Sequence, residues 1–174
     1  AFNTCIRRSL QELDQMLTRV DDQFVASKSI LRDGDCNAIT IRDRLQNLRV
    51  SPEDTIFFYY AGHGAQDANG HFLQTSATGG NDLRRTEITE LIQRHNARLS
   101  VIITESCNAA ATFKTKEVAS MSRHRSSGPT KLEELLLSYR GLIDVNSADD
   151  GQYGWGNPTH GGFFSKFFTE DLLV

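Results

Sequence analysis

The sequence predicts an α/β fold, a three-layer α-β-α sandwich built around a mostly parallel sheet. Two observations predict it: amphipathic helical patterns alternate with short apolar runs, and two of these runs are apolar on both faces. Strands of that kind are typical of parallel sheets that helices cover on both sides. With 174 residues and a mass of 19.5 kDa, the chain suits one compact domain.

Helical periodicity marks three segments. Apolar residues recur every three or four positions in residues 4–17, 40–48 and 85–94. This spacing predicts amphipathic helices whose apolar stripes face a core. Residues 24–31 are partly apolar and end at the turn Asp33-Gly34-Asp35, which predicts a short strand between the first two helices.

The strongest strand signals are the runs TIFFYYA at 55–61 and LSVIIT at 99–104. Both are short and β-prone, which predicts strands buried from both sides in the middle of a parallel sheet. His63 and Cys107 follow these two runs almost directly, and a loop rich in Gly, Asn and Asp comes after His63. Ligands bind beyond the carboxyl ends of such strands, so we expect both side chains at one edge of the sheet.

His63 and Cys107 are a candidate catalytic dyad. A thiolate is a strong nucleophile, and a neighbouring imidazole can take the thiol proton and later protonate a departing amine. The glycines beside His63 allow a sharp turn, and the amides of Gly64 and Cys107 would form a two-donor oxyanion hole. This scheme requires no metal or organic cofactor. A cysteine after a strand is more often a small core residue, which is our interpretation of Cys5 and Cys36.

Composition and charge exclude several classes of function. Apolar residues make up 39% and charged residues 24% of the chain, and the net charge of −3 lacks a polyanion-binding signature, so no nucleic-acid partner is expected. The three cysteines contain no CxxC pair, which favours a reducing, cytoplasmic setting over a disulfide framework. No apolar run approaches the roughly 18 to 20 residues that span a bilayer, so no membrane association is expected.

The motifs resemble those of one family. DTIFFYYAGHGAQ is similar to the histidine motif of metacaspases and prokaryotic caspase homologues (orthocaspases), and VIITESCNAA is similar to their nucleophile motif. The segment GLIDVNSADDGQYGWGNPTHGGFFSKFF resembles the last core strand, the substrate loop and the start of the closing helix of such domains. The His-then-Cys order is also that of caspases. The resemblance runs from about residue 5 to the end and implies a caspase-like sheet, His63 as general base and acid, Cys107 as nucleophile, and the Gly64 and Cys107 amides as the oxyanion hole.

The sequence departs from the family pattern in three places. Glu105 stands where family members usually have Asp, and Asn108-Ala109-Ala110 replaces a His-Ser-Gly or Arg-Gly ending. The first core strand that such domains carry before the opening helix is absent, and the chain begins without methionine. We therefore expect a truncated N-terminus, and with it the loss of a residue of the substrate pocket.

Charge predicts the specificity. The resemblance to metacaspases and paracaspases implies an acid two positions before the nucleophile, here Glu105, and a P1 residue that is Arg or Lys. A carboxylate in a partly desolvated pocket pairs with a guanidinium and repels an aspartate, so we expect protein or peptide substrates cleaved after Arg, then Lys. Asp149 or Asp150, in the stretch that resembles the substrate loop, would complete the pocket. A solvated acidic turn explains these two residues equally well.

Residues 112–131 are polar, basic and rich in Ser, which predicts an exposed linker open to proteolytic nicking. The resemblance implies that this linker divides a single domain, residues 1–174, into a large-subunit-like part (1–111) and a small-subunit-like part (132–174), and that the enzyme cleaves itself there. With a basic P1 residue, the candidate self-cleavage sites are Lys114, Lys116, Arg123, Arg125 and Lys131. An unprocessed surface loop is the alternative.

Calcium activates many metacaspases, but the acids here are scattered and no dense ligand set of the EF-hand kind appears. Calcium dependence therefore has no support in the sequence, and no metal site is expected. The scattered acids are Asp67, Asp82, Asp149 and Asp150. The remaining histidines have no partner at ligand spacing and are interpreted as surface or loop residues: His71, His95, His124 and His160. The closer resemblance to metacaspases implies a monomer.

Two other functions stay open. A catalytically silent caspase-like module would act by binding a partner, although the presence of both His63 and Cys107 weighs against it. A different Cys-His hydrolase, such as an esterase or amidase, would usually need glycines around the nucleophile, which residues 104–110 lack.

Overall fold

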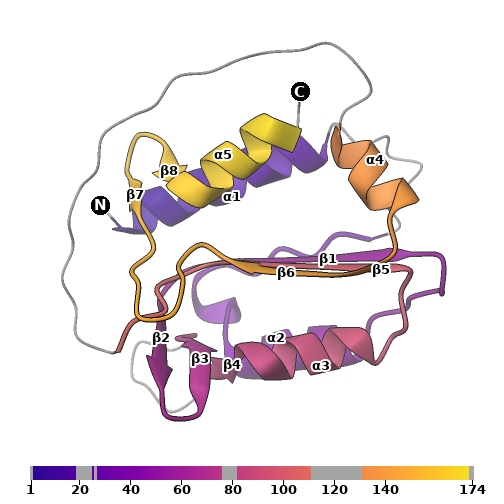
Figure 1. Cartoon of the computed structure of the whole chain (residues 1–174), viewed down its shortest axis with the longest axis horizontal. Coiled ribbons are helices and arrows are strands. Elements are labelled where there is room, and N and C mark those ends of the chain that lie inside the picture. Colours follow the sequence, from indigo (N-terminus) through magenta and orange to yellow (C-terminus); the bar gives the residue numbers. More distant parts are fainter. Residues whose placement is uncertain (1, 19–24, 26, 76–81, 111–130, 173–174) are drawn as a thin grey trace. The chain divides into compact units, whose positions relative to one another are not determined.

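A computed structural model describes residues 2–18, 25, 27–75, 82–110 and 131–172 (Figure 1). The chain forms two compact units, each assembled from segments that are distant in sequence. One unit draws on residues 29–112 and 140–154 and contains a parallel sheet, so we call it the sheet unit. The helical unit draws on residues 1–28, 113–139 and 155–174. These boundaries do not follow the predicted division into parts 1–111 and 132–174, which stays a prediction.

The parallel sheet has the strand order β1-β5-β6. Its strands are β1 (Thr55–Ala61), β5 (Leu99–Glu105) and β6 (Gly141–Asn146), and both pairs are parallel. All three strands end at the same edge, because Ala61 pairs with Glu105 and Asn146 pairs with Thr104. The α/β class and the parallel sheet are therefore confirmed.

The two strongest strand signals occupy different places in this sheet. Residues Leu99–Thr104 of β5 are all buried, as predicted for a strand with an apolar sequence on both faces. In β1 only Ile56 and Tyr60 are buried and the other residues are half-buried. Among the described strands β1 lies at the edge of the sheet, so its predicted central position is wrong.

Helices α2 (Ala38–Gln46) and α3 (Arg85–Gln93) lie side by side on one face of the sheet (Figure 1). They agree closely with the predicted helices. Asn37 caps α2, because its side-chain oxygen accepts a hydrogen bond of 3.0 Å from the backbone N–H of Thr40. The core between helices and sheet consists of apolar side chains of both, among them Ile41, Leu45, Ile56, Tyr60, Ile88, Leu91, Ile92 and Ile102.

A small antiparallel sheet follows β1, where the sequence predicted only a loop. It consists of β2 (Gly64–Asp67), β3 (Gly70–Leu73) and β4 (Leu83–Arg84), in the order β2-β3-β4. The pair Asn69-Gly70 is the sequence signal for this hairpin, since tight hairpin turns need residues that tolerate a positive φ. Gly70 has a φ of 96°.

The short strand predicted over residues 24–31 is not formed where the structure describes this segment. Residues 25 and 27–31 carry no strand. Val25 is 43% and Ile30 44% exposed, whereas Leu31 packs half-buried against the core of the sheet unit. Strand preference depends on packing against neighbouring strands, and none of these described residues pairs with a strand.

The helical unit contains α1 (Phe2–Leu17), α4 (Lys131–Ser138) and α5 (Phe163–Leu172), together with the hairpin of β7 (Gly156–Asn157) and β8 (Gly161–Gly162). Helix α1 confirms the predicted opening helix and lies beside α5 (Figure 1). The buried Ser9 connects α1 to β8 by a hydrogen bond, which its Oγ accepts from the N–H of Gly162 at 2.7 Å. No helix within the described ranges has both the length and the apolar character needed to cross a membrane.

Candidate active site

The loops that follow β1 and β5 meet at the carboxyl edge of the parallel sheet. The N–H of Gly62 donates to the carbonyl oxygen of Glu105 at 3.2 Å, one residue beyond the register pair of Ala61 and Glu105. Further along, the N–H of Gln66 in β2 donates to the carbonyl oxygen of Ala109 at 3.1 Å. The chain around His63 therefore runs alongside the chain around Cys107.

Both glycines of the Gly-His-Gly motif are required by close packing. A Cβ atom on Gly64 would lie 2.7 Å from the carbonyl oxygen of Cys107 and 2.8 Å from the Cβ of Ser106. A Cβ atom on Gly62 would lie 2.4 Å from the hydroxyl of Tyr60. Only glycine allows these approaches, and the approach at Gly64 brings the loops of the predicted dyad into backbone contact.

The side chain of His63 is exposed, while its backbone is held firmly. Its carbonyl oxygen accepts hydrogen bonds from the N–H of Gln74 at 2.9 Å and from the hydroxyl of Tyr60 at 3.0 Å. Burial raises the pKa of Tyr60, which keeps this hydroxyl protonated as a donor. Partial desolvation lowers the pKa of the His63 imidazole, so the neutral, proton-accepting form prevails at neutral pH.

Cys107 is a half-buried free thiol that lies two residues beyond the end of β5. The peptide group that precedes it is anchored by Asn146, the last residue of β6. Asn146 Nδ2 donates to the carbonyl oxygen of Ser106 at 3.3 Å, and Asn146 Oδ1 accepts from the hydroxyls of Thr104 at 2.8 Å and Ser106 at 3.2 Å. Asn146 has no signal in the sequence for this role, since only strand pairing brings β6 beside β5.

The acidic loop after β6 is joined to the nucleophile loop by main-chain hydrogen bonds. The N–H of Asn108 donates to the carbonyl oxygen of Gln152 at 2.9 Å, and the N–H of Gly151 donates to the carbonyl oxygen of Asn108 at 3.0 Å. The neighbouring Asp149 and Asp150 are exposed. The loop that carries these two predicted pocket acids therefore lies beside the nucleophile.

Glu105, the third predicted pocket acid, is the last residue of β5 and is half-buried. Its Oε2 accepts a hydrogen bond of 2.8 Å from the hydroxyl of Tyr59 in the neighbouring strand. This bond restrains the carboxylate at the edge of the sheet where the predicted dyad lies.

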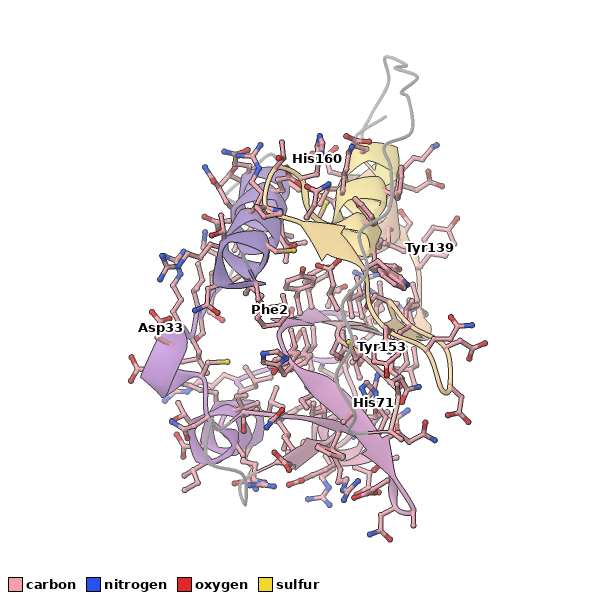
Figure 2. The ribbon with its side chains drawn as sticks, turned by 90° about the vertical axis from the view of Figure 1, so that its left-hand side faces the viewer. Phe2, Asp33, His71, Tyr139, Tyr153 and His160 are labelled. Carbon is pink, nitrogen blue, oxygen red and sulfur yellow. The ribbon has the colours of Figure 1, made fainter. Side chains whose placement is uncertain are left out.

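His71 was interpreted as a surface or loop residue, and this interpretation is wrong. It lies in β3 and is half-buried, with its ring Nε2 3.0 Å from the carbonyl oxygen of Cys107 and 3.2 Å from Ser106 Oγ (labelled in Figure 2). The Asn69-Gly70 turn is the one sequence signal for this placement, because it folds β3 back on β2.

His71 also borders a pocket. This pocket has a volume of about 350 Å³ and is lined by His71, Arg85, Thr86, Thr89, Glu90 and Asp144. Arg85 and Asp144 form an ion pair within it, and Asp144 also accepts a hydrogen bond of 3.1 Å from the hydroxyl of Thr89. The charges of Arg85 and Asp144 in this pocket are therefore paired with each other.

Of the candidate self-cleavage sites, only Lys131 is described. It is exposed and is the first residue of α4, so the predicted linker overlaps this helix at its last position. Lys114, Lys116, Arg123 and Arg125 lie outside the described residues.

Asp67, one of the scattered acids considered for calcium, forms a bidentate pair with Arg84, with both distances at 2.7 Å. Nowhere in the described part of the chain do three or more His, Cys, Asp or Glu side chains gather in a way that could hold a metal ion.

Comparison with known families agrees with this geometry. The family model of the caspase domain matches residues 3–173, which is nearly the whole chain. No protein among the curated sequences matches the chain. The match includes both motifs, the parallel strands and the closing helix, and it agrees with the predicted α/β sandwich. The chain therefore belongs to the caspase domain family of cysteine peptidases.

Proposed function

We propose that this protein is a cysteine endopeptidase that hydrolyses peptide bonds after Arg, and less readily after Lys, with Cys107 as nucleophile and His63 as general base and acid. The observation that carries the proposal is the backbone contact between the two loops, in which Gly64 approaches the carbonyl group of Cys107. This contact supports a shared site for a thiol and an imidazole from different strands.

The proposed reaction requires only these two side chains and one water molecule. His63 takes the proton of the Cys107 thiol, and the thiolate attacks the carbonyl carbon of the substrate. The tetrahedral intermediate collapses as the C–N bond breaks, and His63 gives its proton to the departing amine. A water molecule, deprotonated by His63, then cleaves the thioester, which releases the carboxylate product and the free thiol. No cofactor takes part in these steps.

The direction of the backbone amides supports the proposed oxyanion hole. Amides two residues apart on a strand point to the same side. Because the N–H of Gln66 points towards the nucleophile loop and donates to Ala109, the N–H of Gly64 points to that side as well. Together with the N–H of Cys107 it would provide two donors for the oxygen of the tetrahedral intermediate.

The acids near Cys107 support the proposed preference for a basic P1 residue. Glu105 lies two residues before the nucleophile with its carboxylate restrained by Tyr59, and the loop of Asp149 and Asp150 is hydrogen-bonded to the nucleophile loop. A restrained carboxylate binds a guanidinium through two parallel hydrogen bonds, whereas an ammonium offers a point charge. This difference favours Arg over Lys.

Fluorogenic peptides that differ only at P1, with Arg, Lys, Asp or Ala, test this function. We expect turnover of the Arg peptide first and the Lys peptide second, its loss in Cys107→Ala and in His63→Ala, and its retention in Cys5→Ala, which removes a half-buried thiol of the helical unit. A folded protein without Cys107-dependent turnover would contradict the peptidase and favour the silent interaction module. A preference for Asp at P1 would contradict the proposed pocket.

A further inference from the structure

We propose that His71 is a positioning residue for the nucleophile, which holds the peptide group after Cys107 by donating a hydrogen bond from Nε2 to the Cys107 carbonyl oxygen. The two atoms are 3.0 Å apart. The role of this bond in turnover rests on the proposed function, whereas the bond itself does not.

The surroundings of His71 fix which ring nitrogen carries the proton. A carbonyl oxygen can only accept, so Nε2, which faces the Cys107 carbonyl, must be the protonated nitrogen. Ser106 Oγ, 3.2 Å from the same Nε2, is then free to donate its own proton to Asn146 Oδ1, also at 3.2 Å. Every proton in this chain of contacts has an acceptor.

The peptide group between Cys107 and Asn108 is thereby held at both ends. Its carbonyl oxygen is bound by His71 from β3, and its N–H is bound by the carbonyl oxygen of Gln152 from the loop after β6. Since Asn146 anchors the preceding peptide group, the backbone on both sides of Cys107 is restrained. The backbone dihedral angles φ and ψ of Cys107 set the direction of its thiol and of its amide. Misplacement of a reacting group by about 1 Å can cost a factor of about 100 in rate.

The charges around His71 favour a geometric role over a second acid/base role. Burial lowers its pKa, and the cationic Arg85 lowers it further, whereas the Cys107 carbonyl and the anionic Asp144 act in the opposite direction. Glu90 is the other acid of the pocket that His71 borders. The neutral ring has one N–H, which the Cys107 carbonyl uses. The opposite nitrogen, Nδ1, is buried and has no hydrogen-bond partner among the described residues.

Two amide substitutions of His71 distinguish the hydrogen bond to the Cys107 carbonyl from a packing role of the ring. The side-chain amide of His71→Gln extends about as far as Nε2 and can donate to the Cys107 carbonyl, whereas that of His71→Asn is too short. We expect His71→Asn to lower kcat about 10- to 100-fold with little change in KM, and His71→Gln to recover most of this loss. The matched control is His95→Asn, which removes a ring 2.7 Å from the carbonyl oxygen of Leu45, a residue of α2. It should leave kcat unchanged.

Amide hydrogen exchange of the peptide covering residues 106–110 gives a readout that needs no substrate. Exchange should accelerate in His71→Asn, return towards the wild-type rate in His71→Gln and stay unchanged in His95→Asn. If the wild type lacks Cys107-dependent turnover, the proposed function fails, and hydrogen exchange still tests the bond. Wild-type kcat and exchange in His71→Asn, or equal losses in the Asn and Gln variants, would overturn the proposal.

Discussion

Gly64 and Cys107 are in backbone contact: a Cβ atom on Gly64 would lie 2.7 Å from the carbonyl oxygen of Cys107. The histidine loop and the nucleophile loop come from two parallel strands, and this contact fixes the distance between them. The same carbonyl oxygen lies 3.0 Å from Nε2 of His71. The geometry of the nucleophile thus depends on residues of β2 and β3, which the motifs alone do not include.

Gly64→Ala should therefore impair both folding and activity. The new methyl group would meet backbone and Ser106 atoms that cannot rotate away, and forced overpacking of this kind costs about 1–3 kcal/mol. The free energy of unfolding measured in urea and kcat/KM for a P1 Arg peptide should both decrease. The control is Gly34→Ala, since a Cβ atom there meets nothing within 4 Å. Wild-type stability in Gly64→Ala would show that the two loops are not in contact in solution.

Tyr60→Phe should lower stability and turnover together. The buried hydroxyl of Tyr60 lies 3.0 Å from the carbonyl oxygen of His63 and 3.2 Å from that of Gln74. Its removal leaves a buried acceptor with fewer donors, at a cost of about 1–3 kcal/mol, and loosens the backbone of His63. Thermal unfolding and kcat measure the two effects. Tyr139→Phe, at a tyrosine 53% exposed, is the control and should change stability by less than about 0.5 kcal/mol.

Glu105→Gln should reduce the preference for P1 Arg. The substitution keeps the shape of the side chain and removes the charge, and a hydrogen bond to a charged group contributes about 1.5–3 kcal/mol, which corresponds to a factor of about 10 to 150 in kcat/KM. The ratio of kcat/KM for the P1 Arg and P1 Ala peptides measures the effect. Glu53→Gln, at an exposed acid paired with Arg140, is the matched control. An unchanged ratio in Glu105→Gln would exclude Glu105 from the pocket.

On the acid side, the decline of kcat/KM with falling pH should have its midpoint below the ordinary pKa of histidine. Neutral His63 accepts the thiol proton, so activity is present above the His63 pKa and is lost as the pH falls through it. Because desolvation lowers this pKa from 6.5, the midpoint of the decline in kcat/KM should lie below pH 6.5. A profile recorded from acid to neutral pH with the P1 Arg peptide gives the midpoint. A midpoint above pH 6.5 would contradict this role of His63.

The linker should be cut by the enzyme itself after basic residues. Long incubation of the wild type should yield two fragments, which mass spectrometry would assign to cleavage after Lys114, Lys116, Arg123 or Arg125. Lys131 should be cut less readily, because it begins α4 and proteases bind extended chains. Cys107→Ala should stay intact under the same conditions. Active enzyme with an intact linker would exclude self-processing.

Local sequence patterns predicted much of the fold. The amphipathic spacing in α1, α2 and α3 and the apolar runs of β1 and β5 appear where expected, because burial of an apolar face determines each of them. The strand predicted over residues 24–31 is not formed in its described part, where Val25 and Ile30 stay exposed and Leu31 packs half-buried against the core. The β2-β3 hairpin depends on a turn, whose signal at Asn69-Gly70 is short and easily taken for a loop.

The sequence by itself determined the candidate chemistry: a histidine between glycines after one apolar strand and a cysteine after the next are local patterns, because each needs only its own strand. Tertiary structure alone decided what surrounds them. Strand pairing placed Asn146 beside Ser106, and the hairpin turned His71 back onto Cys107. Such contacts join residues far apart in the chain, so no local spacing encodes them, and they form only when the sheet brings the strand ends together.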